Sequence, residues 1–355
     1  MEKVLMKGNE AIAEAAIQAG CRYFFGYPIT PQNEIPAYMA KKLPKIGGTF
    51  LQAESEVSAI NMVYGAAGAG ARVMTSSSSP GISLKQEGIS YIAGAELPCV
   101  IVNIVRGGPG LGGIQPAQSD YFQAVKGGGH GDYHLIVYAP STLQEMVSLT
   151  MGAFDVADLY RNPVMILGDG MLGQMMEPVE FIKPPARELP KKEWATTGCD
   201  GTRETNIINS LYIDPAELEK KVEELYKKYE LIKEQEVSYE EYNCENADII
   251  VTAYGTTSRI VKSVIEMAKE EGINVGLIRP ITLWPFPYEP ISKYADKDHV
   301  KVFLSVEMSK GQMIEDVKLG VNGKKDVYFY GRTGGMVPTP DDILAEIRNI
   351  MKGVQ

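Results

Sequence analysis

Residues 54–81 read ESEVSAINMVYGAAGAGARVMTSSSSPG, and this stretch decides the fold. Its first part, residues 54–69, is rich in alanine and predicts a helix that Gly70 ends. Arg72–Ser76 then predicts a short strand, which runs into a serine loop closed by a Pro-Gly pair. A helix followed by a strand and a loop is the repeating unit of an α/β fold.

The same alternation extends in both directions along the chain. Residues 9–19 predict a helix, Tyr23–Phe25 a strand, residues 85–95 a helix and Cys99–Val105 a buried strand. The chain from residue 8 to about 170 therefore predicts a sheet with helices on both faces. Loops that follow the strands of such sheets are where ligands bind.

A second α/β unit follows a charged connector. Asp214-Pro215 starts a helix with one apolar stripe, and residues 214–246 carry a net charge of −6 out of −10 for the chain. Strands and helices alternate again from residue 248. We predict a first domain over residues 1–185, a linking segment over 186–246 and a second domain over 247–355.

Composition excludes several classes of function. The 355 residues include 35 Lys and Arg against 45 Asp and Glu, without a basic stripe, so no nucleic acid partner is expected. No apolar run approaches the ~20 residues that cross a bilayer, so no membrane partner is expected. The cysteines lack the spacing of a metal or cluster site and, without a secretion signal, indicate a cytoplasmic protein: Cys21, Cys99, Cys199 and Cys244.

Three loops of the first domain carry chemistry. In YPITP at residues 27–31, two prolines fix the backbone around Thr30, which could contact a carboxylate or cap the next helix. Glu54 and Glu56 lie at the start of an apolar helix, where burial could shift proton affinity or the helix dipole alone could favour acids. Arg106 is the first residue of a glycine-rich loop and could bind a carboxylate or form one surface salt bridge.

Two glycine-containing motifs have no assigned ligand. Gly168-Asp169-Gly170 lacks the paired asparagines that complete a thiamine diphosphate and metal motif, so it predicts a tight turn after a strand. The sequence KGGGHG at residues 126–131 lacks the spacing of a phosphate-binding P-loop.

Together these stretches resemble one family. YPITP at 27–31, residues 54–81 and LPCVIVNIVRGGPG at 97–110 resemble the alpha subunit of the 2-oxoacid:ferredoxin oxidoreductases, most closely the 2-oxoisovalerate members. TAYGTTSR at 252–259 and GLIRPITLWPFP at 276–287 resemble the transketolase C-terminal-like domain of the same subunits. The resemblance implies an α/β fold in which a pyrimidine-binding thiamine diphosphate domain precedes that second domain.

The resemblance also implies roles for residues. Glu56, with Glu54 as the alternative, would bond the aminopyrimidine ring of thiamine diphosphate and act as the catalytic residue. Thr30 and Arg106 would contact the 2-oxoacid. No metal ligand is implied in this chain, and the other cofactor-binding residues would be Tyr27, Pro28, Ile29, Ser79, Pro80 and Gly81. The turn reads SSSSPG where the family more commonly has a TSGPG-like sequence.

The implied reaction needs several subunits. A beta-type subunit would share thiamine diphosphate and hold Mg²⁺, while gamma-type and ferredoxin-like delta-type subunits complete the complex. Iron–sulfur clusters of these partners would carry electrons to ferredoxin as the 2-oxoacid and CoA form acyl-CoA and CO₂. Alternatives are a 2-oxoglutarate-type or pyruvate-type member of the family and a non-catalytic transketolase-like scaffold.

Overall fold

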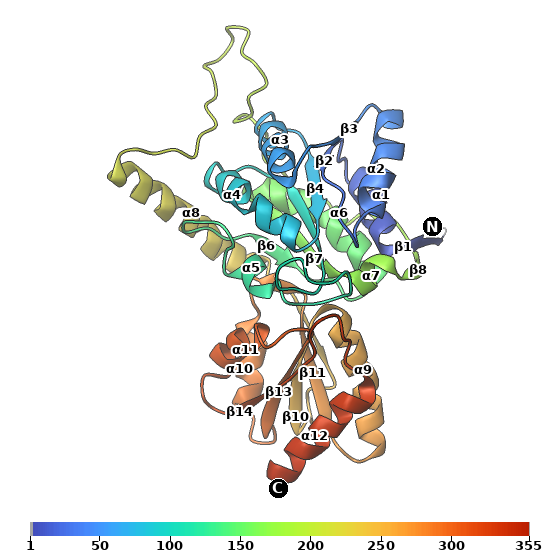
Figure 1. The fold of residues 1–355 in the computed structure, drawn as a ribbon. Coiled ribbons are helices and arrows are strands. Elements are labelled where there is room, and N and C mark those ends of the chain that lie inside the picture. Colours follow the sequence, from blue (N-terminus) through green and yellow to red (C-terminus); the bar gives the residue numbers. More distant parts are fainter. Residues whose placement is uncertain (1–2, 355) are drawn as a thin grey trace.

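A computed structural model describes residues 3–354 as two α/β units stacked end to end (Figure 1). The strands of the first unit are β2 (Tyr23–Gly26), β3 (Thr49–Gln52), β4 (Val73–Ser77), β5 (Val100–Val105), β6 (Ile136–Tyr138), β7 (Val164–Asp169) and β12 (Thr282–Trp284). They lie in the order β12-β6-β7-β5-β4-β2-β3, and all neighbours are parallel except β12 and β6. Strands β4, β5 and β7 are buried along their whole length, because helices cover both faces.

Two groups of helices cover this sheet. One face holds α3 (Glu56–Gly68) and α4 (Pro80–Gly94), which pack against each other; the other holds α1 (Gly8–Gln18), α2 (Glu34–Lys42) and α6 (Leu143–Tyr160) (Figure 1). Shorter elements are β1 (Val4–Lys7), a 3₁₀ turn (Leu43–Ile46), α5 (Tyr121–Val125), α7 (Gly170–Gln174) and β8 (Met176–Val179), with β1 and β8 paired antiparallel. The predicted α/β class is thus the observed one.

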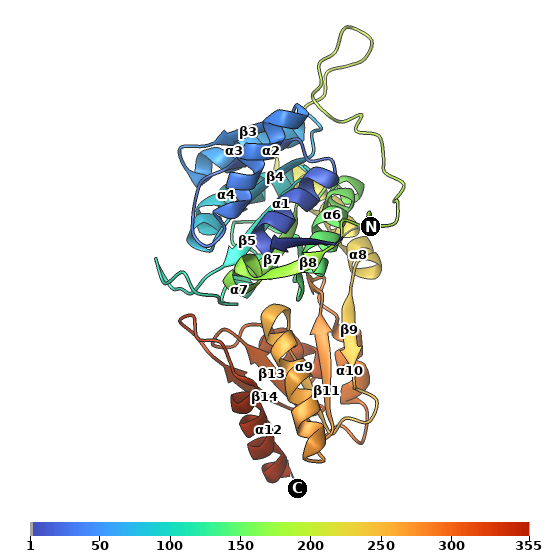
Figure 2. The ribbon, with the colours of Figure 1, turned by 90° about the vertical axis from the view of Figure 1, so that its right-hand side faces the viewer.

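The second unit has a five-stranded sheet. Its strands are β9 (Tyr239–Tyr242), β10 (Ile249–Thr252), β11 (Val275–Pro280), β13 (Val302–Glu307) and β14 (Asp326–Gly331), in the order β14-β13-β10-β11-β9. Figure 2 shows α9 (Gly255–Glu270) and α12 (Pro340–Val354) side by side against this sheet. Helices α10 (Tyr288–Ala295) and α11 (Met313–Val321) form a second packed pair.

The chain enters the second unit, returns to the sheet of the first unit and then completes the second unit. After β8, an arm of turns and bends projects from the first unit and leads to α8 (Pro215–Gln235), which begins at the predicted Asp214-Pro215 cap (Figure 1). Strand β9 of the predicted linking segment pairs with β11 of the second sheet. Strand β12 of the predicted second domain returns to pair with β6 of the first sheet.

Three predicted boundaries are wrong. The helix predicted over residues 85–95 begins at Pro80, because proline fits the first helical position. The helix predicted over 54–69 begins at Glu56, since the Ser55 side chain accepts from the Ser58 N–H as its cap. The turn predicted at residues 168–170 is the end of β7 and the cap of α7, where Asp169 Oδ1 accepts two backbone N–H groups.

Candidate functional site

The three predicted loops meet at the carboxyl ends of neighbouring strands. YPITP follows β2, the serine loop follows β4 and Arg106 follows β5; β4 pairs with both β2 and β5. Arg106 Nη1 donates to Thr30 O at 3.0 Å. The Arg106 N–H donates to Ser79 Oγ at 3.0 Å. The structure therefore brings together residues that are 76 and 27 positions apart in the chain.

Glu56 is the buried acid of the Glu54–Glu56 pair. Its side chain is at the first turn of α3, and the residue is only 6% exposed. Glu54 precedes the helix, is exposed and accepts from Ser58 Oγ at 3.1 Å. A Cβ atom placed on Gly81 would lie 2.7 Å from Glu56 Oε1 and 2.1 Å from Ser77 Oγ. The Glu56 carboxylate thus lies against the first turn of α4, where only glycine leaves room for it.

Several buried polar atoms of the second and third loops have no hydrogen-bond partner among the described residues. The hydroxyl oxygens of Ser77 and Ser78 and the Nε of Arg106 are buried and form no hydrogen bond among the described residues. Buried polar groups normally have partners, so these three favour a polar ligand. Ser79 has a φ of 28°, a strained conformation for a residue other than glycine. The unpartnered hydroxyls and guanidinium N–H therefore suit a ligand that carries both hydrogen-bond donors and acceptors.

Thr30 does not cap the helix that follows it. Helix α2 starts at Glu34 with Asn33 at the cap position, and Asn33 Nδ2 donates to Thr30 Oγ1 at 3.1 Å. In the same loop, Tyr27 is 36% exposed and Pro28 is exposed, while Ile29 is partly buried. The first loop therefore presents both covered and open side chains at the edge of the site.

The Arg106 guanidinium joins the first and third loops. Besides Thr30 O, it donates from Nη2 to Leu111 O at 3.0 Å, and the residue is 9% exposed. It forms no ion pair with the acids of the described chain, which differs from the surface salt bridge considered above. A guanidinium bonded only to carbonyl oxygens keeps its full positive charge for an anionic ligand.

Sequence reasoning missed two buried polar groups at the site. Asn103 of β5 accepts from the Ser79 N–H at 3.1 Å and donates to Asp120 at 2.9 Å, and burial raises the pKa of Asp120. Lys85 of α4 is fully buried. Each interrupts an apolar pattern, Asn103 in VIVNIV and Lys85 in the stripe of Ile82 and Ile89, and that interruption is the signal in the sequence.

A hollow of about 700 Å³ adjoins these loops. The first unit lines it with Thr30, Ile114 and Met171, and the second unit contributes Gly335 and Val337. The site therefore opens towards the junction of the two units, next to the glycine-rich loop.

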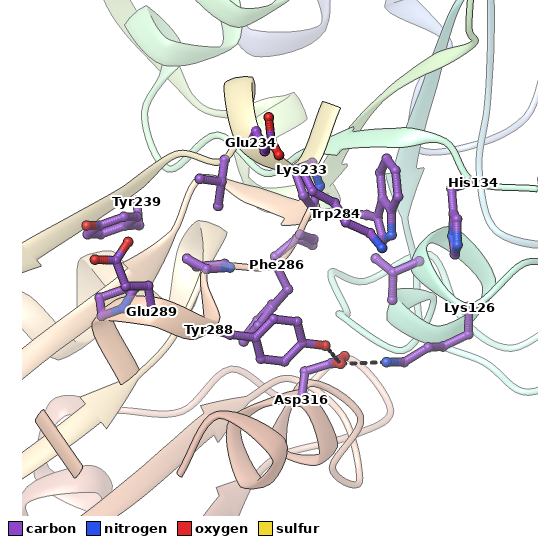
Figure 3. Close-up of a pocket in the computed structure, with 16 residues that line it drawn as sticks. Lys126, His134, Lys233, Glu234, Tyr239, Trp284, Phe286, Tyr288, Glu289 and Asp316 are labelled. Carbon is purple, nitrogen blue, oxygen red and sulfur yellow. Dashed lines mark hydrogen bonds and ion pairs between the residues drawn. The ribbon is translucent and has the colours of Figure 1, made fainter. Parts of the chain in front are cut away.

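A second hollow, of about 550 Å³, contains none of the predicted site residues. It also lies between the units (Figure 3), and Asp316 at its edge accepts from Lys126 Nζ and Tyr288 OH. His134 stacks on Trp284 with ring centroids 4.5 Å apart. The Lys126–Asp316 contact joins the end of α5 to the second unit, and the His134–Trp284 stacking lies beside the β6–β12 pairing, so we assign these contacts to packing.

The fold and site define a chain of the thiamine diphosphate-binding class. Residues 14–240 match the family model described as pyruvate flavodoxin/ferredoxin oxidoreductase, thiamine diphosphate-binding. Residues 247–343 match pyruvate:ferredoxin oxidoreductase core domain II. The chain belongs to the 2-oxoacid:ferredoxin oxidoreductase family, which confirms the resemblance found in the sequence.

Relatives match the chain over nearly its whole length. Ketoisovalerate oxidoreductase subunit VorB of Methanothermobacter marburgensis is 53% identical, over 99% of this chain and 98% of that protein. 2-Oxoglutarate synthase subunit KorA of the same organism is 38% identical, over 98% of each. In the solved structure of 2-oxoglutarate:ferredoxin oxidoreductase from Magnetococcus marinus, the matching chain is 28% identical with a TM-score of 0.87. This chain is covered to 98% and spans 65% of that chain's length.

Membrane and metal features were sought in the same part of the chain. Between residues 3 and 354, every helix is too short or too polar to cross a membrane. Over the same residues, His, Cys, Asp and Glu side chains form no group of three or more suited to a metal ion.

Proposed function

We propose that this chain is the alpha subunit of a cytoplasmic 2-oxoacid:ferredoxin oxidoreductase that oxidises a branched-chain 2-oxoacid. The reaction joins the decarboxylated acyl group to CoA and passes two electrons to ferredoxin. The single observation that carries the proposal is the buried Glu56 carboxylate, set among three loops in a chain 53% identical to a ketoisovalerate oxidoreductase subunit. The 38% identity to a 2-oxoglutarate synthase subunit makes 2-oxoglutarate the second candidate substrate.

In this proposal, Glu56 holds and moves a proton at its carboxylate, opposite a ring nitrogen of the cofactor. Thiamine diphosphate, when bound, would supply a nucleophilic carbon for the reaction at the 2-oxo group. The unpartnered hydroxyls of Ser77 and Ser78 hydrogen-bond to the cofactor or the substrate. Ser79, Pro80 and Gly81 of the second loop and Tyr27, Pro28 and Ile29 of the first would hold the pyrimidine ring. Burial of Glu56 excludes water from the proton transfer.

Thr30 and Arg106 hold the substrate end of the site. The guanidinium has no acid partner among the described residues and its Nε has no hydrogen bond there, so this N–H is free to donate to a carboxylate next to Thr30. Two parallel N–H donors orient a carboxylate better than a point charge does. The adjoining hollow of about 700 Å³ leaves space for a branched side chain.

Partner subunits supply the remaining chemistry in this proposal. A beta-type subunit holds the diphosphate and Mg²⁺, and gamma-type and ferredoxin-like delta-type subunits bring CoA and iron–sulfur clusters to the reaction. Cys21, Cys99 and Cys244 are buried, and His, Cys, Asp and Glu side chains of the described residues form no group suited to a metal ion, which supports clusters in the partners.

The test is a substrate panel on the complex expressed with its partner subunits. We expect ferredoxin or dye reduction that requires CoA, with the highest kcat/KM for 2-oxoisovalerate. Higher kcat/KM for 2-oxoglutarate would assign the second candidate. A complex that binds thiamine diphosphate but reduces no acceptor with any 2-oxoacid would support a scaffold role and overturn the proposal.

A further inference from the structure

Lys85 lies on the face of α4 that packs against α3. Gly81, Lys85 and Gly88 are spaced by four and three residues, so they share one face of the helix. Gly81 faces Glu56 across this interface, and a Cβ atom on Gly88 would lie 2.5 Å from Ile60 Cγ2. Glu56 and Ile60 are themselves four residues apart on α3. The helical spacing therefore puts Lys85 between these two contacts, one turn below the Glu56 carboxylate.

The Lys85 amine is fully buried and reaches the end of β4. Its Nζ donates to Thr75 Oγ1 at 2.6 Å and to Ser76 O at 3.1 Å. Thr75 Oγ1 in turn donates to Phe25 O at 2.6 Å on β2. Lys85 thus connects the strand ends that carry the first and second loops.

An amine in this position is unusual because lysine is rarely fully buried without an ion pair. No acid of the described chain lies within ion-pair distance of Lys85, and β4 faces it with a neutral hydroxyl and a carbonyl. Burial lowers the pKa of Lys85 to about 7, and the nearby charge of Glu56 offsets part of that effect. Of the charged groups described, Glu56 is the one that acts on the amine.

We propose that Lys85 is a positioning residue for Glu56. Its amine ties β4 to α4 one turn from the Gly81–Glu56 contact and places a positive charge that interacts with the carboxylate. This inference rests on the proposed function, because it takes Glu56 to be the group that moves a proton to and from the cofactor. A neighbouring cation stabilises an ionised carboxylate, and the removal of Lys85 is expected to take that stabilisation from the site.

The first test compares pH profiles of the reconstituted complex. Lys85→Met removes the charge at similar length, and Lys85→Gln keeps an amide donor for the β4 oxygens. We expect both variants to lose about tenfold in kcat with KM for the 2-oxoacid changed less than about twofold. The acid limb of kcat against pH should move up by about one pH unit, because a carboxylate without a neighbouring cation binds a proton more readily.

Lys228→Met is the matched control. Lys228 is a largely buried lysine on α8, where burial lowers its pKa to about 8 and Glu96 accepts from its Nζ at 3.2 Å. Removing it should leave the acid limb unchanged. If Lys85→Met and Lys85→Gln also leave the acid limb unchanged, Lys85 only ties β4 to α4 and the inference is wrong.

A second test needs neither cofactor nor activity. Thermal unfolding of the full chain is measured for wild type, Lys85→Met, Glu56→Gln and the double variant at pH 6.5 and pH 9.5. Because the folded protein binds the Lys85 proton less tightly than the unfolded chain does, the stability of the wild type should rise between these pH values relative to Lys85→Met.

The effects of Glu56→Gln and Lys85→Met on Tm should also be non-additive at pH 6.5. Glu56→Gln should lower Tm more in the wild type, where it leaves a buried cation without its counter-charge, than in Lys85→Met. Additive changes at pH 6.5 would overturn the inference. This outcome is separable from the proposed function: non-additive unfolding in a complex that oxidises no 2-oxoacid would retain the Lys85–Glu56 coupling and reject the reaction.

Discussion

Gly81→Ala tests whether the Glu56 carboxylate must lie against the first turn of α4. The added Cβ would lie 2.1 Å from Ser77 Oγ, 2.7 Å from Glu56 Oε1 and 3.2 Å from Glu56 Cγ. Contacts below 3.0 Å do not persist, so atoms must move. The Ser77 hydroxyl has no hydrogen bond among the described residues and can rotate away. The added Cβ would also lie too close to two atoms of the Glu56 side chain, so we expect this side chain to move out of the site.

The expected effect is large on rate and moderate on stability. A displacement of about 1 Å at a reacting group lowers the rate by about 10²-fold. Overpacking lowers the free energy of unfolding by about 1–3 kcal/mol, and the higher helix propensity of alanine offsets about 1 kcal/mol of that loss. We therefore expect kcat of the reconstituted complex to fall by about 10²-fold, while the Tm of the chain falls by at most about 8 °C.

Gly65→Ala is the matched control on α3, because no atom lies within 4 Å of the Cβ that it would add. It should raise Tm slightly and leave kcat unchanged. The reasoning is refuted if Gly81→Ala keeps kcat within threefold of wild type while Glu56→Gln does not, since the catalytic carboxylate would then be elsewhere during turnover.

Three further predictions concern the same site and the assembly. Glu56→Gln should lower kcat by about two to four orders of magnitude with a smaller change in thiamine diphosphate affinity measured by titration, whereas Glu54→Gln should stay within twofold; the reverse pattern would reassign the role to Glu54. Arg106→Lys and Arg106→Ala should raise KM for the 2-oxoacid in that order, by a factor corresponding to about 1.5–3 kcal/mol for alanine, and equal rises in KM for CoA would mean that Arg106 only supports the glycine loop. The isolated chain should show no oxidation of 2-oxoacids until its partner subunits are added, and turnover by the chain alone would contradict the division of chemistry among subunits.

Much of the fold could be predicted because its signals are local. The buried strand Val100–Val105 is an apolar run between turn residues, and the α8 start at Asp214-Pro215 is a helix cap. Once strands and helices alternate, parallel pairing puts the ends of β2, β4 and β5 along one edge of the sheet. The meeting of the three loops follows from that rule, although no single loop carries enough information to identify a site.

The connections between the two units could not be predicted from local patterns. Residues 282–284 read as part of the second unit, yet β12 pairs with β6, and Trp284 stacks on His134 of the first unit. A three-residue strand has too few positions for alternation to reveal its partner. Nearby, Asp316 accepts from Tyr121, Lys126 and Tyr288, so the residues after β12 also contact the first unit through partners that are distant in the sequence.

The environment of Glu56 depends on packing between α3 and α4, and this explains why Lys85 was missed. From sequence, Glu56 is one acid at a helix start, and a helix dipole explains such acids without any catalytic role. The structure adds three facts that the sequence does not contain: the carboxylate is buried, Gly81 leaves room for it, and Lys85 is buried on the same face of α4. A dipole alone does not require a buried lysine one turn away. The position of Lys85 in a stripe of isoleucines is therefore the observation that best distinguishes a catalytic role for Glu56 from a role in stabilising the start of α3.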